Sequence, residues 1–120
     1  MVLLMDDDDA FRGALADNLR DDGYHVLAFG GIHELPSLAR LKKVSAVVTD
    51  YDMPGTDGLA FADLFHTAHP AVPIIMVTAY STPQLEADIS TREYLSLLRK
   101  PFDYDDLHGL LGQLIISSPG

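Results

Sequence analysis

Aspartates that follow short apolar runs are the residues of this sequence with the clearest capacity for chemistry. Asp50, Asp52 and Asp57 lie within eight positions after the run AVVT, around a Pro-Gly pair, and residues 6–9, all aspartate, follow the run VLLM. Carboxylates this close repel one another, so they need either solvent or a cation between them. Because Asp, Pro and Gly are ordinary turn residues, a solvated turn is the simpler interpretation and a cation site the more specific one.

Two other polar side chains follow apolar runs later in the chain. Thr78 comes directly after PIIMV, and Lys100 comes shortly after YLSLL. Clustered carboxylate oxygens suit a hard divalent cation such as Mg2+, which binds one or two carboxylates together with water and phosphate oxygens. A hydroxyl and an ammonium beside them are groups that bind phosphoryl oxygens. These residue types therefore point to phosphoryl chemistry, if the fold brings them together.

Strand-like apolar runs alternate with helical patterns along the chain. The expected strands are residues 2–5, 24–29, 46–49, 73–77 and 94–98. Apolar stripes of helical spacing predict helices that contain residues 11–19, 61–68 and 107–114. Two further connections carry weaker helical patterns: leucines three apart at 34–42, and an N-cap threonine followed by a proline at 82–83.

This alternation predicts an α/β fold, a five-stranded parallel sheet with helices on both faces. The nearly continuous apolar runs are typical of strands that are buried on both faces. Binding sites in such sheets form at the carboxyl ends of the strands. We therefore expect the acidic runs, Thr78 and Lys100 to meet at one edge of the sheet.

Length and composition limit the classes of function. With 120 residues, 48% of them hydrophobic and none of them cysteine, the chain is expected to form one globular domain without disulfides or thiol chemistry. The formal charge of −10 opposes direct binding to nucleic acid. No apolar run is long enough to span a bilayer and the N-terminus lacks a basic segment, so the expectation is a cytoplasmic protein without membrane contact.

Four motifs in order make the sequence resemble a known family. They are LLMDDDDAFR, VVTDYDMPGTDG, IIMVTAY and RKPF. Together they resemble the receiver, or phosphoacceptor, domain of bacterial two-component response regulators. The resemblance covers residues 1–116 as the receiver domain, with 117–120 as a tail or the start of a linker. It implies a flavodoxin-like sheet with the strand order 2-1-3-4-5.

The resemblance also implies roles for the acidic residues. Asp50 would accept a phosphoryl group from a phosphohistidine. Asp7 and Asp50 would bind Mg2+ directly, Asp6 would act through water, and Asp52 would contribute its backbone carbonyl. The carboxylates would then be tolerated because a cation lies among them.

Further roles and partners follow from the same resemblance. Thr78 would hydrogen-bond the phosphoryl oxygens, Lys100 would pair with them, and the bond from Lys100 to Pro101 would be cis. The partner would be a sensor histidine kinase or a phosphotransfer protein. The face formed by residues 82–116 would contact a second copy or a downstream effector. The chain would be a signalling module that catalyses only its own phosphorylation and dephosphorylation.

One position departs from the family pattern. Receivers usually carry an aromatic residue three positions before the lysine, and here that position is Leu97. Tyr94 lies an odd number of residues away, so strand alternation predicts that its side chain points to the other face of the sheet. Asp8, Asp9 and Asp57 are expected to cap or begin helices rather than to bind metal.

Two alternative functions remain open from the sequence. The DYD motif matches the nucleophile pattern of a Mg2+-dependent phosphatase of the haloacid dehalogenase type. That family places its motif on the first strand and has a threonine where Pro54 stands, so we rank it far lower. The other alternative is a receiver that never switches and serves only as a docking surface. The retention of the acidic pair Asp6 and Asp7, of Asp50, and of Thr78 and Lys100 argues against it.

Overall fold

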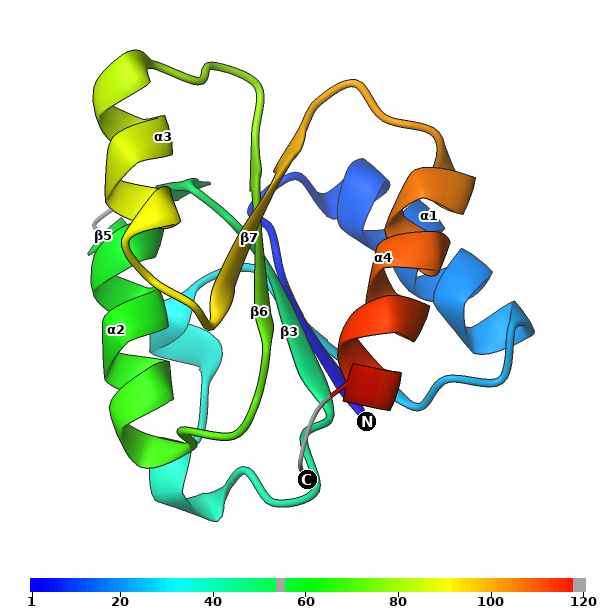
Figure 1. Cartoon of the computed structure of the whole chain (residues 1–120). Helices are drawn as coiled ribbons and strands as arrows, with labels where there is room; N and C mark the ends of the chain where they lie inside the picture. The colour runs from blue at the N-terminus through cyan, green and yellow to red at the C-terminus, as the bar shows by residue number, and fades with distance from the viewer. Residues whose placement is uncertain (54–55, 118–120) are drawn as a thin grey trace.

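A parallel sheet between two layers of helices forms the core of the computed structural model, which describes residues 1–53 and 56–117. The five strands of this sheet are β1 (Val2–Met5), β2 (Val26–Phe29), β3 (Ala46–Asp50), β6 (Ile74–Thr78) and β7 (Leu95–Arg99). The α-helices are α1 (Asp9–Asp21), α2 (Gly58–Ala68), α3 (Pro83–Ser90) and α4 (Tyr104–Ser117). Figure 1 shows α2 and α3 on one face of the sheet and α1 and α4 on the other.

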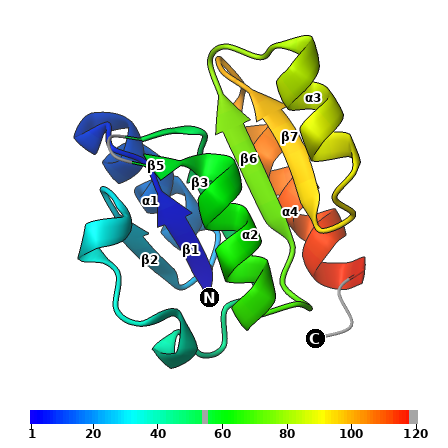
Figure 2. The same cartoon turned by 90° about the vertical axis from the view of Figure 1, so that its left-hand side faces the viewer.

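The strand order β2-β1-β3-β6-β7 is the predicted order 2-1-3-4-5, counted along the strands of this sheet. All four strand pairs are parallel, and Figure 2 shows the strands behind α2 and α3. β1, β3 and β6 lie in the middle, and nearly all their side chains are buried, which explains their continuous apolar sequences. The predicted fold class is confirmed.

Each face of the sheet has its own apolar core. On one face, Phe61 and Phe65 of α2 and Leu85 of α3 pack against Leu3 and Val47 of the strands. On the other face, the apolar stripes of α1 and α4 pack against the alternate strand residues. In both cores, alternate residues of the strands therefore pack against the apolar sides of the helices.

The connection between β2 and β3 differs from the expectation of a helix at 34–42. The structure describes the backbone of this connection throughout, and it contains two 3₁₀ turns, Ile32–Glu34 and Leu38–Arg40, and no α-helix. Pro36 lacks an amide donor and favours an extended conformation for Leu35, which has ψ 142°. The leucines three apart match the 3₁₀ period, and they still pack against the core on the α2 side.

A two-stranded antiparallel hairpin, β4 (Asp52–Met53) and β5 (Thr56–Asp57), follows β3 and was not expected from the sequence. The Pro54-Gly55 turn between these strands lies outside the described residues. Within the described part of the chain, no helix is long and apolar enough to cross a membrane.

Candidate functional site

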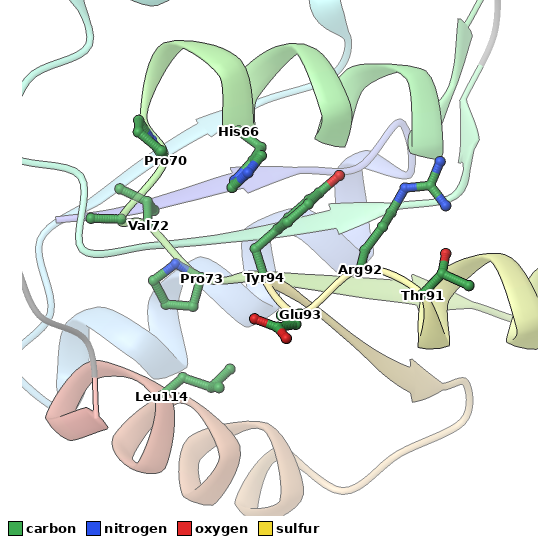
Figure 3. A pocket seen from close by; sticks show the side chains of 10 residues that line it. His66, Pro70, Val72, Pro73, Thr91, Arg92, Glu93, Tyr94 and Leu114 are labelled. Carbon is green, nitrogen blue, oxygen red and sulfur yellow. The ribbon is translucent and has the colours of Figure 1, made fainter.

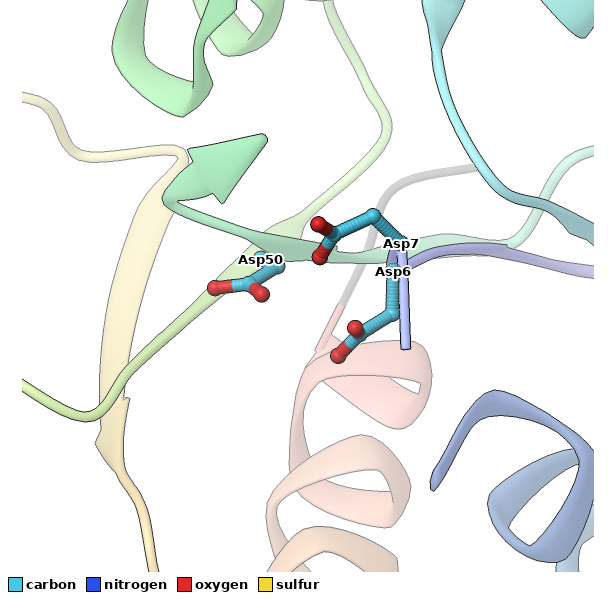
Figure 4. Close-up of side chains that lie close together, drawn as sticks. All are labelled: Asp6, Asp7 and Asp50. Atoms are coloured by element: carbon cyan, nitrogen blue, oxygen red, sulfur yellow. The ribbon is translucent and has the colours of Figure 1, made fainter. Parts of the chain in front are cut away.

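Three carboxylates converge at the carboxyl edge of the sheet. Asp6 and Asp7 follow β1, Asp50 is the last residue of β3, and these two strands pair side by side. One oxygen of each carboxylate lies within 4.8 Å of the others, and Figure 4 shows the three side chains close together. Asp6 is 2% exposed and Asp50 7%, whereas Asp7 is open to solvent. The fold therefore creates a negatively charged cluster that opens outward through Asp7.

Lys100, which directly follows β7, reaches into this cluster. Its Nζ lies 3.0 Å from Asp6 Oδ2 and 3.5 Å from Asp50 Oδ2. Its backbone amide donates to the carbonyl of Thr78 at 2.8 Å, and the Lys100-Pro101 bond is cis, as expected. One ammonium thus pairs with two of the three carboxylates.

Three carboxylates against one ammonium leave the cluster with excess negative charge, and burial and these charges shift the pKa values of Asp50 and Lys100. Burial raises the pKa of Asp50 above its usual value and the charge of Asp6 raises it further, although Lys100 and the amide of Asp52 oppose this. Burial alone would lower the pKa of Lys100, but its hydrogen bond to Asp6 and the charges of both aspartates outweigh that effect and raise it. The cluster therefore favours any added positive charge.

Thr78 and Asp52 lie at the site but have other hydrogen bonds in this structure. Thr78 ends β6 and is fully buried, and its hydroxyl oxygen lies 3.2 Å from both the backbone nitrogen and the backbone oxygen of Tyr80. The backbone amide of Asp52 donates to Asp50 Oδ1 at 3.2 Å, while the Asp52 side chain is exposed. Tyr80 is 81% exposed, so its side chain faces solvent.

The aspartates assigned to helix ends do behave as caps. Asp8 accepts a hydrogen bond from the amide of Phe11, and Asp57 accepts one from the amide of Ala60. Thr82 caps α3 in the same way, with Pro83 at the first helical position. These side chains satisfy amides that have no partner within the helix.

Two residues shape the site in ways that the sequence did not reveal. Arg12 donates from Nη1 to the backbone carbonyl of Asp6 and from Nη2 to Asp9 Oδ1, each at 2.6 Å, so it fixes the acidic loop. At Gly58, a Cβ atom would lie 2.8 Å from the carbonyl oxygen of Asp50. The i, i+3 spacing of Asp9 and Arg12 is a local signal from which this ion pair could have been predicted. The contact at Gly58 depends on the tertiary fold and leaves no local signal.

A second cluster of polar side chains lies at the opposite edge of the sheet. Arg92 donates to Asp63 from Nε at 2.8 Å and from Nη2 at 3.0 Å, and the hydroxyl of Tyr94 also donates to Asp63. The ring of Tyr94 stacks on His66 with centroids 3.7 Å apart. His66, Arg92 and Tyr94 line a pocket of about 680 Å³, which Val72, Pro73 and Leu114 also line. Figure 3 shows their side chains around it.

This cluster corrects the prediction for Tyr94. Tyr94 and Leu97 pack against the same core, on the α2 side, so Tyr94 does not point to the other face. The reason is that β7 begins only at Leu95, and a turn closed by the Leu95 amide and the Arg92 carbonyl precedes it. Strand alternation therefore does not extend to residue 94.

Comparison with known proteins decides the family. Residues 2–111 match the model of the response regulator receiver domain. The chain belongs to this family. Membership argues against the phosphatase alternative, and so does the fold, because Asp50 ends β3 and not the first strand of the chain.

Named relatives of this receiver domain are longer proteins. It is 36% identical to the response regulator protein FleR of Pseudomonas aeruginosa, over 94% of this chain and 25% of that protein. It is 32% identical to the DNA-binding transcriptional regulator NtrC of Salmonella typhimurium, over 96% of this chain and 24% of that protein. The chain thus spans about a quarter of the length of these relatives.

Solved receiver structures share the fold. The non-phosphorylated receiver domain of HemR from Leptospira biflexa superposes with a TM-score of 0.89 at 24% identity, over 99% of this chain and 96% of that one. A response regulator from Burkholderia pseudomallei, solved with a phosphorylated aspartic acid, a calcium ion and citrate, has a TM-score of 0.82 at 24% identity, over 92% of this chain and 65% of that one. At this identity, the likeness concerns the fold.

Proposed function

We propose that this receiver domain is a phosphorylation-controlled switch in which Asp50 accepts a phosphoryl group from a phosphohistidine of a sensor kinase or phosphotransfer protein. The observation that carries the proposal is the convergence of three carboxylates and one ammonium on the carboxyl edge of the sheet. Asp50 is the member of this cluster that ends the central strand β3, so its carboxylate is held by the sheet itself. A fixed nucleophile suits phosphoryl transfer, where positioning and charge neutralisation dominate.

The residues of the cluster fit a divalent cation. Asp6, Asp7 and Asp50 offer only hard oxygen donors, and burial, followed by the charge of Asp6, raises the pKa of Asp50. We assign Asp7 and Asp50 as direct ligands of Mg2+, Asp6 as a residue that acts through water, and the backbone carbonyl of Asp52 as a further ligand. When bound, the ion neutralises the carboxylates and draws the phosphoryl oxygens toward the site.

In the transfer step, an oxygen of Asp50 forms a bond to phosphorus while the bond from phosphorus to the donor imidazole nitrogen breaks. The electron pair of the broken bond returns to that nitrogen. Asp50 Oδ1 is held by the amide of Asp52, and Oδ2 lies near Lys100, so the carboxylate has a defined orientation before the reaction. Lys100 then pairs with the phosphoryl oxygens, and Thr78 exchanges its contact with the Tyr80 backbone for one with the phosphoryl group.

This exchange connects the site to the face that we propose for output. Thr78 precedes the loop that leads into α3, and Lys100 follows β7, whose Arg99 forms an ion pair with Glu86 of α3. A shift of Thr78 and Lys100 toward Asp50 therefore acts on α3, β7 and the start of α4. We propose that a second copy or a downstream effector reads this face, residues 82–116, and that Leu97 does not act as the reporter.

Labelling with a small phosphodonor tests the proposal. With acetyl phosphate and Mg2+, the intact mass should increase by one phosphoryl group in the wild type and in Asp52→Asn, which keeps the backbone of the site. Asp50→Asn should remain unmodified. Equal modification of Asp50→Asn would refute the assignment, and sustained turnover of a phosphate monoester would support a phosphatase instead.

A further inference from the structure

The ammonium of Lys100 has a third neighbour besides the two aspartates. Its Nζ lies 4.3 Å from the centroid of the Phe11 ring, over the face of that ring. The face of an aromatic ring carries negative electrostatic potential and attracts a cation within about 6 Å. The ring therefore adds an attraction for the ammonium to those of the two carboxylates.

Phe11 is itself held firmly by its surroundings. Its amide donates to the capping carboxylate of Asp8 at 3.0 Å, and the amide of Asp8 donates to Asp6 Oδ1 at 2.9 Å. On its other side, the ring of Phe11 makes an edge contact with Phe102, with centroids 6.0 Å apart and planes at 88°. The ring is thus fixed to the loop that carries the acidic residues and to the residue after Pro101.

We propose that Phe11 is a positioning residue that keeps the Lys100 ammonium at the edge of the carboxylate cluster, within reach of an incoming phosphoryl group. This inference rests on the proposed function of Asp50. Carboxylates bind the ammonium through hydrogen bonds and neutralise its charge, whereas a ring face holds it without neutralising it. The charge that Phe11 keeps in place remains available to phosphoryl oxygens.

The position of Phe11 in α1 allows its ring face to be removed with little loss of packing. Phe11 lies in the first turn of α1 and contributes to the apolar core on the α1 and α4 side as a partly buried residue. A leucine would fill much of the same space and contact that core, but it has no ring face for the ammonium. Phe11→Leu therefore removes the contact with Lys100 while it preserves most of the packing, and Phe11→Trp keeps a ring face.

Proton NMR tests the contact without phosphorylation. In the wild type, the ring current of Phe11 should shift the ε-methylene protons of Lys100 upfield, and this shift should vanish in Phe11→Leu and persist in Phe11→Trp. Unshifted Lys100 protons in the wild type would overturn the inference, whether or not Asp50 is the phosphoacceptor.

Phosphorylation kinetics test the consequence. With acetyl phosphate and Mg2+, Phe11→Leu should be modified about three- to tenfold more slowly than the wild type, and Phe11→Trp should recover most of the rate. In a Lys100→Met background, Phe11→Leu should change the rate less than about twofold, because the ring acts through the lysine. Phe65→Leu, the same replacement in the core on the other face, serves as the control for lost packing and should keep the wild-type rate.

The outcomes separate the two proposals. An equal slowing by Phe11→Leu in both backgrounds would show that the ring acts through packing alone and would overturn the inference. A wild type that accepts no phosphoryl group would refute the proposed function, while the NMR shift would still decide whether the ring holds the lysine.

Discussion

The two edges of the sheet use the same kinds of charged groups to opposite effect. At the carboxyl edge, three carboxylates lie together with one ammonium that pairs with two of them, and burial together with the charge of Asp6 raises the pKa of Asp50. At the amino edge, one carboxylate, Asp63, receives two hydrogen bonds from Arg92 and one from Tyr94, and the bond from Arg92 is the main reason that its pKa is lowered. Carboxylates thus repel one another at the carboxyl edge, whereas the carboxylate at the amino edge is paired with hydrogen-bond donors.

This difference shows how the fold divides its tasks. The pairing of Asp63 ties α2 to the turn before β7, and Arg92 also donates to the carbonyl of Asp88 near the end of α3 at 2.5 Å. These contacts hold α2, the last part of α3 and the turn before β7 together. In the proposed function, the excess charge at the other edge costs stability but would provide affinity for a cation and a phosphoryl group, a compromise that is common at functional sites.

Mg2+ should produce the largest change, and only through the carboxyl edge. A ligand that binds only the folded state adds about 2.7 kcal/mol to the free energy of unfolding at a hundredfold excess over its dissociation constant. Asp7→Asn should lose most of this gain, whereas Asp63→Asn should keep it despite lower stability overall. Chemical denaturation with and without Mg2+ would measure both. An equal stabilisation of Asp7→Asn and Asp63→Asn by Mg2+ would contradict the different roles of the two edges.

Removal of the Tyr94 hydroxyl should have a smaller effect, confined to the amino edge. Tyr94→Phe loses a hydrogen bond to a charged group, but the Asp63 side chain is 46% exposed and keeps Arg92, so we expect a loss of about 1 kcal/mol. The rate of phosphorylation should stay at the wild-type value. Thermal denaturation and the acetyl phosphate assay would measure the two quantities, and a slower reaction with unchanged stability would count against this assignment.

The smallest expected effect is a difference between the two edges in how stability depends on pH. Without Mg2+, the raised pKa of Asp50 means that its ionised form costs stability, a cost that disappears as pH falls through that pKa. The advantage of Asp50→Asn over the wild type should therefore shrink between about pH 7 and about pH 4. The lowered pKa of Asp63 means that its contribution is present above the usual carboxyl value and is lost as pH falls through the lowered one.

The deficit of Asp63→Asn should accordingly stay nearly constant over the range in which the Asp50→Asn advantage shrinks. Urea denaturation of both variants and the wild type at several pH values would follow the two differences. Parallel curves for the two variants would show that the edges do not differ in the way described.

The fold and the carboxyl edge were accessible from the sequence because their signals are local. Continuous apolar runs identify the buried strands, and in a parallel sheet their carboxyl ends necessarily share an edge, which brings Asp6, Asp50 and Lys100 together. Where local patterns were ambiguous, prediction failed. The leucines three apart at 34–42 belong to a segment with 3₁₀ turns and not to an α-helix, because Pro36 disfavours an α-helix there.

The amino edge could not be predicted because its contacts join residues far apart in the chain. Asp63 and Arg92 are separated by 29 positions, and neither lies in a motif. Tyr94 was assigned to the wrong face because strand periodicity was extended beyond the true start of β7 at Leu95. The contact between the Phe11 ring and Lys100 joins residues even farther apart in sequence, since one lies in α1 and the other directly follows β7.

The central claim, that equal carboxylates have opposite energetic roles at the two edges, can be tested by one comparison. The free energy of unfolding should be measured in urea at neutral pH with a chelator present, for the wild type, Asp50→Asn and Asp63→Asn. We predict that Asp50→Asn is more stable than the wild type, because it removes a buried charge from a repulsive cluster. Asp63→Asn should be less stable by about 1–2 kcal/mol, because Arg92 and Tyr94 lose a charged partner. Changes of the same sign in both variants would contradict the claim.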